Sequence, residues 1–237
     1  MNYVSLTSLD LAGAAILVVL LAITSFYLHL GIGKQLLIVT LRATIQLLLI
    51  GLVLKILFGS NNPWLLFLVA AVMLFVASRE VSARQKRRFK GWWNWNISVN
   101  ALFISSFSIT LLTLIVIIDN HPWYSPQYAI PLLGMILGNS MSAIALSLDR
   151  LTQSVYQSKE IIEQRLLLGE TAFVSISDIR RESIRAGMLP IMNALATAGV
   201  VNLPGMMTGQ ILAGSPPLEA VKYQQLQDLQ HYNMIQL

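Results

Sequence analysis

The few polar side chains that interrupt the apolar segments of this sequence are the ones whose types and spacing could do chemistry. Asn139 and Ser140 are adjacent in one apolar segment, and Asn193 lies in another, close to Met188 and Met192. A polar group in lipid is costly unless it has a partner or lines a polar path. We interpret Asn139, Ser140 and Asn193 as candidates for a translocation path.

Arg42 and Gln46 form a second candidate pair, because a spacing of four residues puts both side chains on one face of a helix. Arg42 lies about two turns from one end of its apolar segment, so its long side chain could also reach the lipid headgroups. The two roles, a path residue and a headgroup contact, stay open at this point.

Motifs for catalysis are missing from the sequence. There is no G-x-x-x-x-G-K-[ST] loop to hold nucleotide phosphates, no H-E-x-x-H pair and no G-x-S-x-G elbow. The chain has no cysteine, and its 3 histidines are far apart in the sequence. No group of carboxylates resembles a cage for a hard cation. We therefore expect no enzyme activity and no cofactor bound by this chain, and the metal ligands, if any, stay unknown.

The segment LPGMMTGQILAGSPP (203–217) combines helix breakers with polar and sulfur-bearing side chains. A helix does not pass easily through its prolines, and non-helical backbone near lipid must be covered by protein or line a cavity. We expect either an outer loop or a re-entrant element that lines a path. Methionine sulfur is a soft ligand that suits copper(I), and it is also a common packing group. The path candidates in this segment are Met206, Met207, Thr208 and Gln210.

The composition of the chain indicates a membrane protein. Hydrophobic residues make up 55% of the 237 residues and charged residues only 11%, against about 25% charged in a soluble domain. A bilayer core about 30 Å thick needs a helix of roughly 20 mostly apolar residues. Six segments meet or approach that length and predict an all-α, polytopic membrane protein. They are about 9–28, 35–58, 63–78, 97–118, 129–148 and 187–203.

Charged residues gather in two segments between the predicted spans, 79–95 and 149–186. An excess of Lys and Arg marks cytoplasmic loops, so both segments are expected inside and the N-terminus outside. These loops account for the formal net charge of +5, and we expect no nucleic-acid partner. The longer segment has the pattern of two amphipathic helices, about 151–168 and 177–186, which indicates a docking surface for a partner.

A stripe of small residues runs along the fifth predicted span, where Gly134, Gly138 and Ser142 recur at every fourth position. Such a stripe lets another membrane helix approach closely. We therefore expect close helix packing along it.

Several long runs of the sequence resemble a known family. They are LRATIQLLLIG (41–51), PLLGMILGNSMSAIALSLDRL (131–151), EQRLLLGET (163–171) and SIRAGMLPIMNALATAGVVNLPGMMTGQILAGSPPLEAVKYQ (183–224). Together they resemble the FetB-type permeases, membrane subunits of ATP-binding-cassette (ABC) exporters linked to iron efflux, with plant relatives linked to aluminium tolerance.

The resemblance implies a function and a set of partners. It implies a permease of the bacterial plasma (inner) membrane that exports iron for metal homeostasis and works as a homodimer. ATP would be hydrolysed by a separate cytoplasmic ABC ATPase subunit, which agrees with the missing phosphate loop. Segment 159–186 is similar to the cytoplasmic loop by which such permeases engage their ATPases. The residues expected to couple the two subunits are Glu163, Gly169, Arg180, Arg181 and Gly187.

The end of the chain departs from the family pattern. Family members continue into a seventh apolar span, whereas residues 225–237 read QLQDLQHYNMIQL and hold no run long enough to cross a bilayer. We expect one permease domain over residues 1–224, followed by an atypical tail from a truncation or a frameshift. Two alternatives to an ATP-driven exporter stay open. One is a secondary transporter or channel with Arg42 and Gln46 along its path, and the other is a truncated, non-functional permease copy.

The side of the membrane on which the two charged segments lie is the first testable consequence. Reporter tags at residue 85 and at residue 160 should both report the cytoplasmic side, because both positions lie in arginine-rich segments. Tags that report opposite sides would overturn the predicted arrangement of spans.

Overall fold

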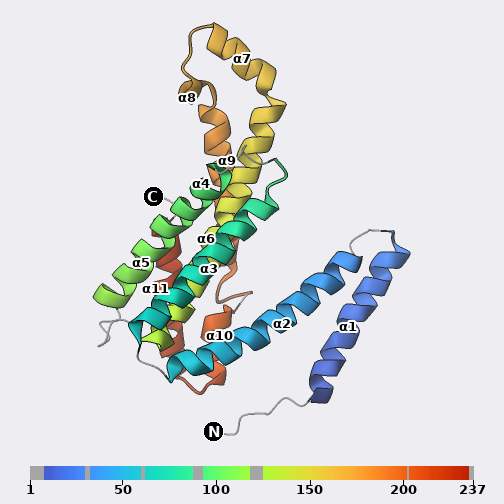
Figure 1. The fold of residues 1–237 in the computed structure, drawn as a ribbon, viewed down its shortest axis with the longest axis vertical. Coiled ribbons are helices and arrows are strands. Elements are labelled where there is room, and N and C mark those ends of the chain that lie inside the picture. Colours follow the sequence, from blue (N-terminus) through green and yellow to red (C-terminus); the bar gives the residue numbers. More distant parts are fainter. Residues whose placement is uncertain are drawn as a thin grey trace. The chain divides into compact units, whose positions relative to one another are not determined.

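The computed structural model describes residues 8–29, 33–59, 62–87, 93–117, 125–201 and 203–234. It divides the chain into two units, residues 1–61 and 62–237. Every regular element in the described part of the chain is a helix, which confirms the predicted all-α class (Figure 1).

The first unit is a helical hairpin of α1 (Ser8–Tyr27) and α2 (Gly33–Phe58) (Figure 1). Gly33 lies where an added Cβ would be 3.1 Å from the carbonyl oxygen of Ala22, so a glycine there lets the two helices approach. No residue of the most apolar stretch of α2 is buried within the structure. An apolar helix of this kind is suited to contact with lipid.

The second unit is built around α6 (Pro126–Gln157). α3 (Pro63–Arg84) packs along α6, and so does the helical stretch that follows it, which is made of α4 (Trp93–Leu102), η1 (Phe103–Phe107), α5 (Ser108–Leu112) and η2 (Thr113–Ile117). η1 and η2 are π-helical turns within one continuous helix. The buried cluster between these helices consists of Ala77, Val81, Leu102, Leu137 and Ala145.

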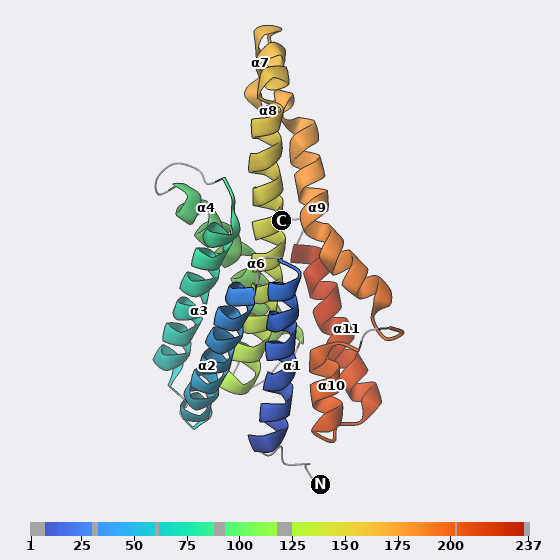
Figure 2. The ribbon, with the colours of Figure 1, turned by 90° about the vertical axis from the view of Figure 1, so that its right-hand side faces the viewer.

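The remaining helices follow α6 in the chain. They are α7 (Lys159–Leu167), α8 (Ala172–Ser175), α9 (Ser177–Thr197), α10 (Gly205–Leu212) and α11 (Pro217–Met234). α9 returns alongside α6, and α7 and α8 lie at the end of this pair that is remote from α10 and α11 (Figures 1 and 2).

Four helices of the described residues are long and apolar enough to cross a membrane: Gly33–Phe58, Pro63–Arg84, Trp95–Val116 and Pro126–Gln157. The apolar part of α1, Ala15–Tyr27, is shorter. These helices confirm the polytopic membrane class, and they agree with the predicted spans to within a few residues except at the C-terminal ends of α3 and α6. The count of six spans and the outside N-terminus stay predictions.

α6 extends well beyond its predicted span of 129–148. Its 32 residues correspond to about 48 Å, longer than a bilayer core of about 30 Å. The predicted helix at 151–168 is therefore wrong in its bounds, because α6 continues to Gln157 and α7 begins only at Lys159. A change from apolar to charged side chains does not end a helix, since the backbone hydrogen bonds can continue into water.

α9 also differs from the prediction. The separate helix at 177–186 and the span at 187–203 are wrong, because α9 is one helix from Ser177 to Thr197. Its apolar part, residues 186–197, corresponds to about 18 Å, which is too short to cross a bilayer core.

The segment 203–217 was expected to be non-helical, and this was wrong for its middle. α10 occupies Gly205–Leu212, and the helix breakers lie at its ends, with Pro204 at its N-cap position. Gly214 ends it with a φ of 90°, a left-handed conformation that favours glycine. α11 then starts at Pro217 and continues to Met234, through most of the predicted atypical tail.

α9 and α6 pack closely at Gly187. A Cβ at Gly187 would be 2.7 Å from the carbonyl oxygen of Ala143 and would also collide with the Ser147 side chain. The predicted small-residue stripe is less crowded. A Cβ added at Gly134 would be 3.2 Å from Met73 Cε of α3, and a Cβ added at Gly138 would have no neighbour within 4 Å. The close contact therefore requires glycine at position 187 of α9 rather than along the predicted stripe of α6.

Replacement of this glycine tests the contact. Gly187→Ala should lower the stability of the protein in detergent by about 1–3 kcal/mol, because overpacking forces the helices apart. The midpoint of thermal unfolding measures the effect. Gly138→Ala is the matched control, and it should not destabilise, since its Cβ enters open space and alanine favours helix. Equal effects of the two substitutions would contradict the proposed close contact.

Candidate functional site

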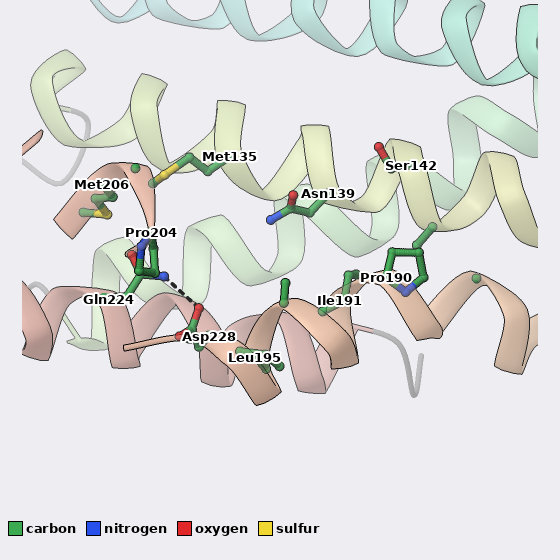
Figure 3. A pocket seen from close by; sticks show the side chains of 15 residues that line it. Met135, Asn139, Ser142, Pro190, Ile191, Leu195, Pro204, Met206, Gln224 and Asp228 are labelled. Atoms are coloured by element: carbon green, nitrogen blue, oxygen red, sulfur yellow. Dashed lines mark hydrogen bonds between the residues drawn. The ribbon is translucent and has the colours of Figure 1, made fainter. Parts of the chain in front are cut away.

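A cavity of about 510 Å³ lies between α6, α9, α10 and α11 (Figure 3). Most of the side chains that line it are apolar, and α9 contributes Ile191, Ala194 and Leu195. This volume is within the range of small-molecule sites in proteins. A cavity of this size can also hold water, because a water molecule occupies about 30 Å³.

Polar groups enter the cavity from two opposite walls. Asn139 and Ser142 come from α6, and Gln224 and Asp228 come from α11. Gln224 Nε2 donates a hydrogen bond to Asp228 Oδ1 at 2.8 Å, as Figure 3 shows. The Ser142 hydroxyl donates to the carbonyl oxygen of Gly138 at 3.1 Å, so it is already satisfied by its own helix.

Two methionines line the cavity as well. Met135 lies on α6 and Met206 on α10, and both thioethers are drawn at one end of the cavity in Figure 3. Sulfur and oxygen donors are thus brought to one cavity from segments far apart in the sequence. The structure supplies donors of both kinds without a complete ligand cage of His, Asp or Glu in its described part.

The third feature of the cavity is irregular backbone. Ala198 and Pro204, which flank the turn between α9 and α10, both line it. Pro190 lines it too, and as a proline within α9 it leaves the carbonyl of residue 186 without its usual helical partner. Backbone of this kind survives in a membrane where protein or a cavity covers it.

The structure brings together some of the predicted path residues and leaves others apart. Asn139 and Met206 line the cavity. Ser140 points elsewhere, because it is buried and receives a hydrogen bond from Ser106 of η1 at 3.3 Å. Asn193 is exposed on α9. The role of each of these residues in transport stays a prediction.

The remaining path candidates do not line the cavity. Met207, Thr208 and Gln210 lie on α10, where the Thr208 hydroxyl donates to the carbonyl oxygen of Gly205 at 3.0 Å. Gln210 Oε1 is buried without a hydrogen-bond partner. Arg42 and Gln46 are exposed on α2 and belong to the first unit.

A second candidate site is the connection between α6 and α9, residues 158–176, which we call the docking segment. Arg165 of α7 holds it together by donating to the Ser175 carbonyl oxygen at 3.3 Å and by pairing with Asp178 Oδ2 at 3.4 Å. Gly169 ends α7 with a φ of 93°, and the amide of Glu170 donates to the carbonyl oxygen of Arg165 at 3.1 Å. This pattern is a Schellman motif, so Gly169 has a structural reason to be glycine.

Large apolar side chains are exposed on the docking segment. Leu167, Leu168 and Phe173 are 88%, 86% and 67% exposed. These residues lie beyond the apolar stretch of α6, in a part of the chain that also carries charged residues. Exposed apolar groups in such a setting make the segment a candidate interaction surface.

The predicted coupling residues divide between two places. Glu163 is exposed on α7 and pairs with Lys159 at 3.6 Å. Arg180 lies over the ring of Phe173 at 3.7 Å, and Arg181 is exposed beside it in the sequence. Gly187 instead lies at the contact between α6 and α9 and lines the cavity. Their role in coupling stays a prediction.

The two basic segments lie at the same end of the second unit. The amide of Lys86 donates to Asp149 Oδ1 at 2.9 Å, and the Arg87 guanidinium lies 3.3 Å from the centre of the Tyr156 ring. Gln153 donates to the other oxygen of Asp149 at 2.7 Å. The connection after α3 is therefore attached to the part of α6 that leads to the docking segment.

These features define a polytopic helical membrane protein with an internal cavity and a protruding helical connection. The chain belongs to the family described as Uncharacterised protein family (UPF0014), which matches residues 8–227. No solved structure matches the chain.

Relatives come from bacteria and plants. The UPF0014 membrane protein slr1647 of Synechocystis is 41% identical over 187 residues, which cover 77% of this chain and 70% of the relative. The Probable iron export permease protein FetB of Escherichia coli is 36% identical over 229 residues, which cover 94% and 84%. The Protein ALUMINUM SENSITIVE 3 of Arabidopsis thaliana is 30% identical over 212 residues, which cover 89% and 76%. The family resemblance seen in the sequence is confirmed.

Sequence reasoning missed several residues of both sites. Pro190, Gln224 and Asp228 line the cavity, and the exposed Leu167 and Leu168 are prominent on the docking segment. The spacing of four residues between Gln224 and Asp228 was a usable signal, because it puts both on one helix face. A proline only three residues after Gly187 was another, since it marks an irregular place in a helix.

Single cysteines test the cavity cleanly, because the natural chain has none. Asn139→Cys should react with a small, water-soluble thiol reagent in the purified protein, since residue 139 lines the cavity. Ser140→Cys is the matched control at the next position, and it should react at least about tenfold more slowly because the site is buried against Ser106. Mass spectrometry measures the labelling, and equal rates would contradict a water-accessible cavity.

Proposed function

We propose that this chain is the membrane-spanning permease subunit of an ATP-driven metal exporter, with iron as its cargo and a separate ABC ATPase as its partner. The name of the Escherichia coli relative, a probable iron export permease, supports the class of cargo. This sequence has no phosphate-binding loop, so we assign ATP hydrolysis to a separate ATPase. The complex would contain two copies of the permease and would lie in the inner membrane of a bacterium.

The observation that carries the proposal is the direct connection between the docking segment and the cavity. α6 and α9 run side by side away from the docking segment (Figure 2). Gly187, where the two helices pack tightly, lines the cavity. A movement of the docking segment is therefore transmitted along two packed helices. Pro190 lies within α9 on the cavity wall, where a weakened helix can bend.

The docking segment has the chemistry of a protein interface. Its exposed apolar side chains are Leu167, Leu168 and Phe173. The segment also carries exposed charged residues such as Glu163, and the Arg180 guanidinium lies over the Phe173 ring. Interfaces commonly have an apolar centre and a polar rim. The salt bridge from Arg165 to Asp178 and the glycine turn at 169 hold the segment in a fixed shape, which lowers the entropic cost of docking.

The cavity supplies the other half of the function. It lies where the apolar part of α9 is too short to span, next to the broken helices α9 and α10. Broken helices at a polar cavity are the arrangement on which many transporters bind their substrate. Oxygen donors on α6 and α11 could replace part of the water around a metal ion.

Replacing the two exposed leucines tests the proposal. Leu167→Ser combined with Leu168→Ser should lower the recovery of the ATPase in co-purification at least about tenfold, because central apolar contacts supply most of the energy of an interface. ATP-driven uptake of Fe²⁺ into inside-out membrane vesicles should fall in parallel.

The matched control is Val200→Ser combined with Val201→Ser. These two side chains are 89% and 82% exposed, but they lie in the turn between α9 and α10, away from the docking segment. The control variant should keep full recovery of the ATPase. Fe²⁺ uptake that does not depend on ATP in the unmodified protein would exclude an ATP-driven exporter.

A further inference from the structure

Gln224 of α11 is a buried polar side chain of the cavity wall with one unsatisfied atom. The residue is only 8% exposed, and its Oε1 is buried without a hydrogen-bond partner. Its Nε2 donates to Asp228 Oδ1 at 2.8 Å. An ionised carboxylate can only accept hydrogen bonds, so this contact fixes the orientation of the amide and identifies the free atom as a carbonyl oxygen.

A buried acceptor without a partner indicates the kind of group that would stabilise it. It requires either a hydrogen-bond donor or a positive charge. Asp228 lies one turn further along α11, is partly exposed, and brings a negative charge to the same wall, where its Oδ1 already accepts from Gln224. Among the described residues that line the cavity, none carries a positive charge to meet it. Two oxygen acceptors and one negative charge thus lie together on a wall whose remaining groups are mostly apolar.

We propose that Gln224 and Asp228 form a binding site for a hydrated divalent metal cation in this cavity. This site is where the proposed exporter would bind its metal ion, so its role as a cargo site rests on the proposed function. Gln224 lies within the stretch that the family matches, residues 8–227, whereas Asp228 lies just outside it, in the segment where the sequence departs from the family pattern.

The donor set selects the chemical class of the cation. A carboxylate, a carboxamide oxygen and water molecules suit hard and borderline divalent ions such as Mn²⁺ and Fe²⁺. A cavity of about 510 Å³ has room for such an ion with several water molecules, each of which occupies about 30 Å³. The thioethers of Met135 and Met206 would suit copper(I), but they carry no charge to balance that of Asp228.

The site is also weak enough for a cargo that must leave again. No group of three or more His, Asp or Glu that could hold a metal ion occurs in the described part of the chain. With a single carboxylate, the ion keeps much of its hydration and exchanges readily.

Mn²⁺ binding to the purified chain in detergent, without any ATPase, tests the site. Electron paramagnetic resonance distinguishes free from bound Mn²⁺. Asp228→Asn keeps the size of the side chain and should weaken binding about tenfold or more, because Asp228 carries the one charge among the described residues of the cavity wall. Gln224→Glu should strengthen binding by a similar factor, because it adds a second carboxylate beside the ion. A gain of affinity cannot result from misfolding.

Two control variants make the result specific. Glu219→Gln removes a charge from the same helix, but Glu219 is exposed and paired with Lys222 at 2.8 Å, so Mn²⁺ binding should not change. Met135→Leu removes a sulfur from the cavity and should also leave Mn²⁺ binding unchanged. The proposal is overturned if Gln224→Glu fails to strengthen binding, if Glu219→Gln weakens it as much as Asp228→Asn, or if Met135→Leu abolishes it.

Measurements of Mn²⁺ affinity and of ATP-driven Fe²⁺ uptake distinguish an error in the proposed site from an error in the proposed function. If the site is wrong, Asp228→Asn and Gln224→Glu leave Mn²⁺ affinity unchanged while ATP-driven Fe²⁺ uptake by the unmodified complex persists. If the exporter function is wrong, ATP-driven uptake is missing while the two variants still shift Mn²⁺ affinity in opposite directions.

Discussion

The contact between Gly187 and the backbone of α6 is the constraint on which both candidate sites depend. In lipid, apolar side chains gain little by leaving their solvent, so helices associate through close packing of small residues. Gly187 lets α9 approach the carbonyl oxygen of Ala143 in a way that any side chain would prevent. On one side of this contact lies the cavity, and on the other the two helices continue to the docking segment. A longer distance between α6 and α9 would loosen the packing around both candidate sites.

The second constraint is that backbone polar groups in a membrane need partners or water. The structure meets it where α9 ends, because the turn after Thr197 and the start of α10 lie against the cavity. Pro204 and Pro217 are at the beginnings of helices, where a missing amide hydrogen costs nothing. The prolines therefore divide the chain into short helices rather than preventing helix formation. The cavity beside these helices follows from the same sequence feature.

Much of the fold could be predicted from the sequence because it depends on composition and segment length. The apolar runs that became α1 to α6 were recognisable, since lipid requires long, uninterrupted helices. The boundaries at 151–168, 177–186 and 187–203 were wrong because they were inferred from changes in polarity, to which the helical backbone does not respond. Asn139 and Ser140 show the limit for the site. Neighbours in sequence point about 100° apart on a helix, and only the packing of α6 decides which one meets the cavity.

The small number of charged oxygen donors in the cavity affects how easily a bound ion can leave during a transport cycle. A metal ion held by three or four charged side chains would have to be pulled from a deep energy minimum in every cycle. In this cavity the carboxylate and the carboxamide both belong to α11, whereas the polar groups opposite them belong to α6. A small separation of these walls removes one side of the site without breaking a strong bond. The docking segment continues from α6 and leads into α9, and α11 is not part of it. In the proposed exporter, a pull on that segment would therefore change the distance between the two walls, and this change would release the ion.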